Sequence, residues 1–229
     1  MQTAVSTHTA SVPAASLHFP GYARTKHAGD ISSPAGATLR LAKNEELFGE
    51  GDRAAFFYKV VSGAVRTYKL LDDGRRQIDA FHFPGDIFGI ESGEEHRFTA
   101  EAVAPARVVS FRRCSLETLA AGDGQFARPI IAAIMRSLER AQDHMLLLGR
   151  KSALQKIAHF LLDTSQRASD QDAIELPMSR GDIADHLGLT IESVSRSLTR
   201  LARQGVIELA AQRRTIVLRD KPALRRLDA

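Results

Sequence analysis

Residues 179–207 read SRGDIADHLGLTIESVSRSLTRLARQGVI and predict two short helices joined by a tight turn. Ser179 is a good cap for the first helix, because its hydroxyl can accept a hydrogen bond from a backbone N–H that has no partner within the helix. Gly188 tolerates the left-handed conformation that often ends a helix, and Thr190 can cap the second helix. Apolar residues recur at helical spacing and give each helix one apolar face: Ile183, Ala184 and Leu187, then Val194, Leu198 and Leu201. The segment is therefore predicted to be a helix-turn-helix.

The outer face of the second predicted helix carries charged and polar side chains. Glu192 and Arg196 lie near its beginning, where a glutamate can accept a hydrogen bond from the cytosine amino group and an arginine can donate two to guanine O6 and N7. A half-buried helix with such a face suits the major groove of DNA, so we expect it to be the recognition helix. The alternative is a helical hairpin whose charges are merely solvated. The two caps, the glycine turn, the polar face and the basic tail together favour DNA binding.

The residues that follow the recognition helix are basic. From Arg196 to the end of the chain there are nine lysines and arginines and three carboxylates, an imbalance that favours binding to phosphates. Two β-rich pieces, Val206–Leu209 and Thr215–Leu218, predict a hairpin beside the recognition helix, the wing of a winged helix-turn-helix. Arg213 and Arg214 would lie at the tip of this wing, where they could meet a phosphate backbone.

The composition is that of an ordinary globular protein, with 229 residues, 44% hydrophobic residues, 25% charged residues and a net charge of +4. The single cysteine, Cys114, excludes an intrachain disulfide and a cysteine-based zinc or iron–sulfur site within one chain. Neighbouring cations such as Arg113 could make its thiol a redox site, although a lone cysteine is more often inert. The first residues lack the pattern of a secretory signal and no apolar run could span a bilayer, so we expect a cytoplasmic protein that does not bind membranes.

Between Thr38 and Phe111 the pattern is one of short strands separated by glycine-containing turns. Asp73–Gly74 is a strong signal for a β-hairpin, because it lies between two strand-like segments. Closely spaced strands of this kind indicate a small antiparallel β barrel or roll. The strands that we expect are Thr38–Leu41, Phe56–Ser62, Ala64–Leu71, Arg76–Phe83, Thr99–Ala104 and Arg107–Phe111.

Helical periodicity begins near Gln125 and continues to Gly149. A narrow apolar stripe with spacings of three and four runs along this helix, as in the seam of a coiled coil, and a second copy of the helix is its simplest partner. The alternative is that the helix packs against the roll of its own chain. The expected dimer interface consists of Ile130, Ile134, Leu138, Ala141, Met145 and Leu148.

These patterns divide the chain into a flexible N-terminal arm (1–28), a β roll (29–124), a dimerisation helix (125–149) and a winged helix-turn-helix part (150–229). Within the last part, residues 152–167 predict a helix and residues 169–173 a polar loop. This order of parts resembles the CRP/FNR superfamily of bacterial transcription regulators. The resemblance covers about residues 34–218, and its most specific motifs are FGEGDRAAFFYKVVSGAVRTYKLLDDGRRQIDAFHFPGDIFG and GDIADHLGLTIESVSRSLTRLARQGVI. It implies an α+β fold with an N-terminal antiparallel β roll like a cyclic-nucleotide-binding domain, a long dimerisation helix and a C-terminal winged helix-turn-helix.

The recognition helix is similar to that of the FNR branch, which carries E-x-x-S-R at the positions of Glu192, Ser195 and Arg196. That resemblance implies a homodimer that binds double-stranded DNA at a palindrome of the TTGAT-N4-ATCAA kind. The expected base contacts are Ile191, Glu192, Ser195 and Arg196. The expected phosphate contacts are Arg180, Thr190, Ser193, Arg200, Arg213 and Arg214. The family also implies RNA polymerase as a partner, with residues 72–75 or 93–95 as candidates for the contact.

Two departures from the family bear on sensing. FNR carries an iron–sulfur cluster on four cysteines, three of them near the N-terminus, and this chain has no cysteine there. The cyclic-AMP receptors bind the nucleotide phosphate through an Arg-Ser pair. Here Phe98 follows Arg97, and Glu94 and Glu95 would repel a phosphate. The chain therefore resembles FixK-type regulators, usually activators in low-oxygen respiration or nitrogen fixation, and we expect no cofactor. A cyclic-nucleotide-dependent regulator is the alternative.

A metal-binding β-barrel enzyme of the cupin type is a further alternative of a different class. His82 alternates with phenylalanines in its strand, and only His96 and Cys114 could join it as ligands. Neither has the spacing of a metal motif, and the roll has no H-x-H. We therefore expect no metal site and no catalytic residues, and we expect a regulator rather than an enzyme.

Overall fold

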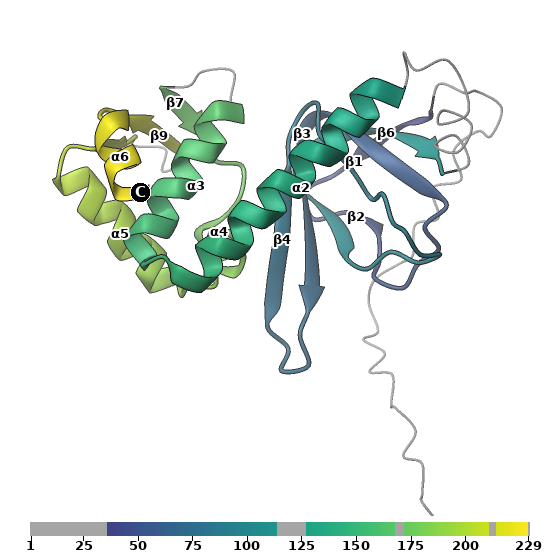
Figure 1. Ribbon diagram of the computed structural model, residues 1–229, viewed down its shortest axis with the longest axis horizontal. Coiled ribbons are helices and arrows are strands. Elements are labelled where there is room, and N and C mark those ends of the chain that lie inside the picture. The colour runs from purple at the N-terminus through teal and green to yellow at the C-terminus, as the bar shows by residue number, and fades with distance from the viewer. Residues whose placement is uncertain (1–35, 114–126, 168–171, 211–213, 229) are drawn as a thin grey trace, which may run out of the picture.

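The computed structural model describes residues 36–113, 127–167, 172–210 and 214–228. Figure 1 shows a β roll and a helix-rich C-terminal part that are connected by one long helix. The roll contains β1 (Thr38–Leu41), β2 (Glu46–Phe48), β3 (Phe56–Leu70), β4 (Arg76–His82), β5 (Ile87–Phe88) and β6 (Thr99–Arg112). The long helix is α2 (Ala127–Arg150). The C-terminal part contains α3 (Ala153–Arg167), β7 (Ala173–Glu175), α4 (Arg180–Leu187), α5 (Ile191–Arg203), β8 (Ile207–Leu209), β9 (Thr215–Leu218) and α6 (Lys221–Asp228).

The strands of the roll form one antiparallel sheet in the order β1-β6-β3-β4, with β2 paired to β6 and β5 paired to β3. The hairpin predicted at Asp73–Gly74 is confirmed, since Leu70 pairs with Arg76 and Gly74 has a φ of 81°. Side chains that alternate along these strands fill the interior of the roll. Its core consists of Leu41, Phe48, Tyr58, Val60, Val65, Phe88, Ala100, Ala102, Ala106 and Val108.

The prediction of two strands on either side of Gly63 is wrong, because β3 is continuous over 15 residues. The pairing of β3 with β6 shifts register on both sides of Gly63, as it does at a β-bulge. A Cβ atom at Gly63 would lie 2.2 Å from the carbonyl oxygen of Pro105. Glycine is thus required here by a close approach of two backbones and not by a chain reversal. Similarly, Thr99–Ala104 and Arg107–Phe111 belong to the single strand β6.

Four short elements were not predicted from the sequence: β2, β5, β7 and α6. The strands β2 and β5 have three and two residues, which is too few for an alternating pattern to be recognised. β7 begins at Ala173, the last residue of the predicted polar loop. α6 follows Asp220, whose carboxylate accepts a hydrogen bond from the backbone N–H of Ala223 at 2.8 Å. The helix predicted at 152–167 is confirmed as α3.

The C-terminal part is built around a small antiparallel sheet in the order β7-β9-β8, with the helices α3 to α6 packed on it. Its buried cluster continues into the roll, where Ile78 and Phe81 of β4 join Leu161 and Leu187. α2 contributes Leu147 to this cluster, and Ala133 is also buried. One side of α2 therefore packs against its own chain. Among the described residues, no helix has both the length and the apolar character needed to cross a membrane.

Candidate nucleic-acid interface

The first helix of the predicted helix-turn-helix, α4, begins with a complete capping box. The Ser179 hydroxyl accepts a hydrogen bond from the backbone N–H of Asp182 at 3.1 Å, and the Asp182 carboxylate accepts one from the backbone N–H of Ser179 at 2.9 Å. Gly188 ends the helix with a φ of 60°. Both predicted signals are confirmed, and they fix the turn that places α5 against α4.

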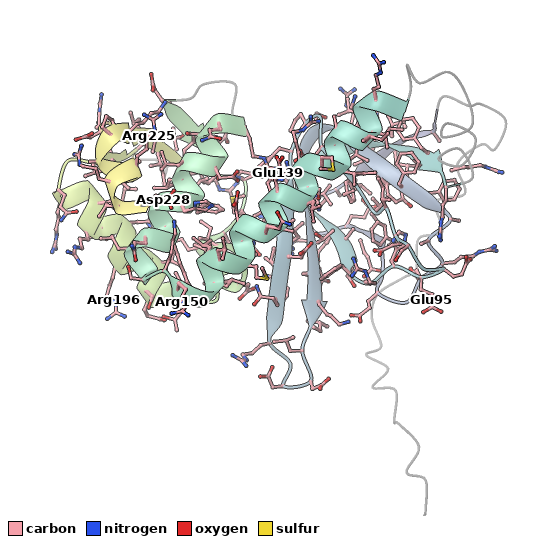
Figure 2. The ribbon with its side chains drawn as sticks, viewed as in Figure 1. Glu95, Glu139, Arg150, Arg196, Arg225 and Asp228 are labelled. Atoms are coloured by element: carbon pink, nitrogen blue, oxygen red, sulfur yellow. The ribbon has the colours of Figure 1, made fainter. Side chains whose placement is uncertain are left out.

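The second helix, α5, has the predicted division into a buried and an exposed face. Thr190 caps it, with its hydroxyl 3.2 Å from the backbone N–H of Ser193. Val194, Leu198 and Leu201 are buried on the inner face. Ile191, Glu192, Arg196, Thr199, Arg200 and Arg203 are exposed on the outer face. Figure 2 shows Arg196 extending away from the rest of the molecule, so its guanidinium can reach a ligand outside the fold.

Glu192 and Arg196 have the charge states that base recognition requires. The backbone N–H of Glu192 itself is the largest influence that holds the pKa of this carboxyl below its usual range. Glu192 is therefore an ionised acceptor at neutral pH. The Arg196 guanidinium makes a long and therefore weak hydrogen bond to the Ser193 hydroxyl oxygen, with Nη2 at 3.4 Å. Ser193, Arg196 and Arg200 also line an open groove of about 640 Å³ between α5, α6 and the start of α3.

Ser195 and Arg180 contact each other. Arg180 Nη1 donates a hydrogen bond to the Ser195 hydroxyl oxygen at 3.1 Å, and both residues are half-buried. The hydroxyl hydrogen of Ser195 remains available to donate to an acceptor on a base edge. The sequence had suggested separate roles for these residues, one at a phosphate and one at a base. The structure brings them together across the turn between α4 and α5.

The predicted wing is present as the β8–β9 hairpin. Arg214 is exposed beside it. Arg213 lies outside the described residues, as does the candidate redox residue Cys114. Glu208 of β8 is paired with Arg219, whose Nε donates to the carboxylate at 2.9 Å, so part of the positive charge near the wing is neutralised.

The side of α2 that faces away from the chain is apolar. Four of the predicted seam residues are exposed: Ile134 by 40%, Leu138 by 49%, Met145 by 66% and Leu148 by 36%. Ala141 is also exposed and Ile130 is half-buried. The same side carries three further exposed apolar residues that the predicted seam did not include: Ile131, Met135 and Leu146. This face is nearly opposite Ala133 and Leu147 on the helix, given 3.6 residues per turn.

The stretch of the roll compared with the cyclic-AMP receptors is occupied by contacts within the chain. Arg97 Nε donates to the Glu91 carboxylate at 3.0 Å, while the Arg97 side chain is 73% exposed. His96 is buried and stacks on Phe48, with ring centroids 3.6 Å apart. The Glu94 side chain is 84% exposed and its carboxylate lies 3.9 Å from Arg113 Nη1, so its negative charge beside this stretch is only partly balanced. The local charge therefore disfavours a phosphate.

His82 lies inside the roll and contacts other side chains of the roll. It is buried, its Nε2 lies 3.0 Å from the Thr67 hydroxyl, and its ring stacks on Phe88. Burial is the largest influence on its pKa, which is lowered to about 3. His82 is therefore neutral at physiological pH. In the part of the chain that the structure describes, no group of three histidine, cysteine, aspartate or glutamate side chains could hold a metal ion.

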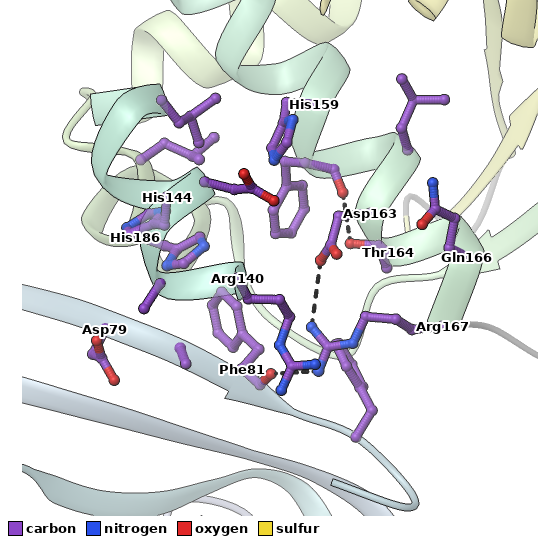
Figure 3. A pocket seen from close by; sticks show the side chains of 18 of the residues that line it. Asp79, Phe81, Arg140, His144, His159, Asp163, Thr164, Gln166, Arg167 and His186 are labelled. Atoms are coloured by element: carbon purple, nitrogen blue, oxygen red, sulfur yellow. Dashed lines mark hydrogen bonds and ion pairs between the residues drawn. The ribbon is translucent and has the colours of Figure 1, made fainter. Parts of the chain in front are cut away.

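A cavity of about 370 Å³ lies where the roll, α2, α3 and α4 meet, and Figure 3 shows its lining. Arg167 crosses its edge, donating to the Phe81 carbonyl oxygen at 2.9 Å and to the Asp163 carboxylate at 3.4 Å. His144 and His186 stack with centroids 4.1 Å apart. Positive and negative side chains are mixed in the lining: Arg140, Arg167 and Arg225, with Asp79, Asp143, Asp163 and Asp228. The cavity therefore has no strong preference for an anion or a cation.

Sequence reasoning missed the residues that attach α4 to the roll. Arg66 and Arg76 of the roll both donate to the Asp182 carboxylate, at 2.8 Å and 2.6 Å. Arg76 also donates to Asp185 at 2.8 Å. These partners are more than 100 positions apart in the chain. No local pattern of spacing could therefore have identified them.

Comparisons with known proteins agree with this architecture. Residues 155–227 match the family model of the Crp-like helix-turn-helix domain, and residues 38–123 match that of the cyclic nucleotide-binding domain. The chain is 46% identical to the nitrogen fixation regulation protein FixK of Azorhizobium caulinodans over 98% of both chains. It is 42% identical to the protein of the same name from Rhizobium meliloti, over 80% of this chain and 82% of the relative.

Among solved structures, FixK2 from Bradyrhizobium japonicum is similar to this chain, with a TM-score of 0.80 and 49% identity. The similarity covers 85% of this chain and 98% of that one. With both family models matched in order, the chain belongs to the CRP/FNR family of DNA-binding transcription regulators. Within that family it is a FixK-type regulator.

Proposed function

We propose that the protein acts as a homodimer, joined along the apolar face of α2, and reads a palindrome resembling TTGAT-N4-ATCAA. The observation that carries this proposal is the outer face of α5, on which Ile191, Glu192 and Arg196 are exposed beside the half-buried Ser195. Two such helices placed one turn of DNA apart would enter successive major grooves. Arg180, Thr190, Ser193, Arg200 and Arg214 surround this face and would contact phosphates, with Arg213 assigned the same role.

The regulated genes are proposed from the relatives. FixK of Azorhizobium caulinodans and of Rhizobium meliloti are named as nitrogen fixation regulation proteins. We assign this protein to the control of genes for nitrogen fixation or low-oxygen respiration, as an activator that contacts RNA polymerase and not as an enzyme. Since its target would be chromosomal DNA, it would work in the cytoplasm. The exposed residues 72–75 and 93–95 are candidates for the polymerase contact.

A cyclic-nucleotide-dependent regulator is the second candidate, because residues 38–123 match the cyclic nucleotide-binding domain. The exposed Glu94 and the pairing of Glu91 with Arg97 argue against it. The two candidates are distinguished by measuring affinity for the TTGAT-N4-ATCAA duplex with and without cyclic AMP. We expect the same affinity in both conditions. A large increase with the nucleotide would favour the second candidate.

The dimer is tested with Leu138→Glu, which places a charge in the centre of the apolar face of α2. Sedimentation should show a dimer for the wild type and a monomer for the variant, because a buried unpaired carboxylate is costly. Loss of the second half-site contact should weaken binding to the palindrome by about a hundredfold or more. Ala132→Glu is the control, since it adds the same single negative charge at an exposed position of the same helix outside the apolar face. A monomeric wild type, or one indifferent to the palindrome, would refute the proposal.

A further inference from the structure

The DNA-reading part is joined to α2 by a very short connection. α2 ends at Arg150 and α3 begins at Ala153, which leaves Lys151 and Ser152 between them. A break of two residues between helices can act as a hinge, because a few φ and ψ angles there can rotate everything that follows. The direction of α5 relative to the dimer helix therefore depends on contacts elsewhere in the molecule.

The roll is joined to α3 by Arg167, which donates to the Phe81 carbonyl oxygen, and to α4 by a larger set of contacts from the β3–β4 hairpin. Arg66 extends from β3 and bridges Glu101 of β6, at 2.6 Å, and Asp182 of α4, at 2.8 Å. Arg76, the first residue of β4, reaches Asp182 at 2.6 Å and Asp185 at 2.8 Å. The result is a continuous charge network that runs from the sheet of the roll to the first helix of the helix-turn-helix.

Two backbone groups extend this attachment toward the end of α4. His186 Nδ1 lies 3.1 Å from the carbonyl oxygen of Ile78, and the Gln77 side-chain amide donates to the carbonyl oxygen of His186 at 3.3 Å. Phe81 packs edge-on against the His186 ring, with centroids 5.2 Å apart. α4 is thus held at both ends by the same strand, β4.

The centre of the network is buried. The side chains of Arg66 and Asp182 are only 8% and 7% exposed. Burial by itself would raise the pKa of Asp182, but hydrogen bonds from Ser179 and the charges of Arg66 and Arg76 lower it below its ordinary value. The carboxylate therefore stays ionised, and removing a cation would leave a buried charge without a partner. Asp182 also completes the capping box of α4 with Ser179, so the network contacts the first turn of the helix.

The network leaves the recognition face free. The network contacts the helix-turn-helix through α4, whereas Glu192 and Arg196 of α5 are exposed. Figure 2 shows Arg196 far from the roll. The attached arrangement is therefore compatible with DNA binding.

We propose that Arg66 and Arg76 are positioning residues for DNA recognition: by holding α4 against the roll they set the separation of the two recognition helices in the dimer. They thereby select the spacing between half-sites that the protein accepts. This inference rests on the proposed dimer and its palindrome. Base contacts require α5 to enter each groove at a fixed position, and the half-site spacing follows from the geometry of the dimer.

The test uses four duplexes, TTGAT and ATCAA separated by three, four, five or six base pairs, and measures the affinity of the full-length protein by fluorescence anisotropy. The wild type should prefer the four-base-pair spacer. In Arg76→Ala the ratio of affinities for the four- and six-base-pair spacers should fall about tenfold, a usual size for coupling between parts of a protein. Arg76→Lys should give an intermediate ratio, because lysine keeps the positive charge but lacks the forked guanidinium that contacts both Asp182 and Asp185.

Arg75→Ala is the matched control. Arg75 is the adjacent residue, with a 78% exposed side chain that pairs with Asp73 within the hairpin, and its loss should leave the spacer ratio unchanged. Should Arg76→Ala fail to fold, as judged by circular dichroism, Asp185→Ala removes a partner that is 34% exposed and should lower the ratio in the same direction.

Two results would overturn the inference. If Arg76→Ala weakens binding equally on all four duplexes, Arg76 is merely structural. If it binds all four more tightly, the network restrains the protein from binding DNA. A wild type without preference for any symmetric duplex would instead refute the proposed function, and the inference would fall with it.

Discussion

At the residue scale, the proposed base recognition depends on Arg196 and Glu192. Both side chains are exposed near the start of α5, on the side opposite Val194 and Leu198. The backbone at the start of the helix keeps the pKa of Glu192 below its usual range, so this residue can only accept hydrogen bonds. Arg196 can only donate them. An acceptor and a donor one helical turn apart match the different groups that cytosine and guanine present in the major groove.

Replacement of Arg196 by alanine should therefore remove selectivity while leaving weak binding to any DNA. A bidentate arginine–guanine contact contributes about 1–3 kcal/mol of discrimination, or roughly 5- to 150-fold, at each half-site. The measurement compares the affinity of Arg196→Ala for the palindrome and for a scrambled duplex. Arg203→Ala serves as the control, since it removes the same charge from the exposed end of α5. Undiminished preference for the palindrome in Arg196→Ala would show that another face reads the bases.

At the scale of elements, the longest strands depend on one glycine. Gly63 allows β3 to continue through a bulge where the backbone of Pro105 and Ala106 passes close by. β3 and β6 can therefore pair along most of their length and form the main wall of the roll. The predicted turn at Gly63 was wrong because glycine before a β-branched segment is compatible with either a turn or a close backbone approach. Only the partner strand distinguishes the two.

Gly63→Ala and Gly74→Ala form a matched pair that tests this interpretation. Their φ angles are 79° and 81°, so alanine should cost about 1–2 kcal/mol at either position for the backbone conformation. A Cβ at Gly74 would meet nothing within 4 Å, but at Gly63 it would lie 2.2 Å from a carbonyl oxygen. Urea unfolding should show a total loss of about 3 kcal/mol or more for Gly63→Ala. Equal losses for the two variants would mean that the bulge relaxes freely.

At the scale of the whole molecule, the roll and the DNA-reading part share one buried cluster. Ile78 and Phe81 of the roll pack with Leu161 and Leu187 beyond α2. His186 lies at this junction, and burial followed by the nearby His144 lowers its pKa to about 3. His82, inside the roll, is shifted to a similar value by burial. The folded molecule therefore holds two histidines in the neutral state.

The free energy of unfolding should consequently fall as the pH is lowered from about 6.5 toward 3. In this interval the unfolded chain binds protons at His82 and His186, with an ordinary pKa of 6.5, while the folded chain does not. Each histidine contributes at most about 1.4 kcal/mol per pH unit. Urea unfolding at pH 7.5 and pH 5.0 measures the difference. His186→Asn, which keeps an N–H donor toward Ile78 but cannot titrate, should show a smaller loss, and a pH-independent wild type would contradict the assignment.

The helices α4 and α5, their caps and the apolar stripe of α2 could be predicted from the sequence, because each depends on residues only a few positions apart. Ser179, Gly188 and Thr190 act on the backbone next to them, and the faces of α2 and α5 follow from 3.6 residues per turn. The same local rules found the Asp73–Gly74 hairpin. They could not find α6 or the shortest strands, which are stabilised by packing more than by their own pattern.

Tertiary structure alone decided how the parts are oriented. The ion pairs of Arg66 and Arg76 with α4, the bulge at Gly63 and the contact of Arg180 with Ser195 join segments that the sequence keeps apart. A side chain's partner across such a distance depends on the three-dimensional path of the whole chain. The side chains on the exposed face of α5 could therefore be predicted from the local sequence. The direction of that face in space depends on long-range packing and charge pairing.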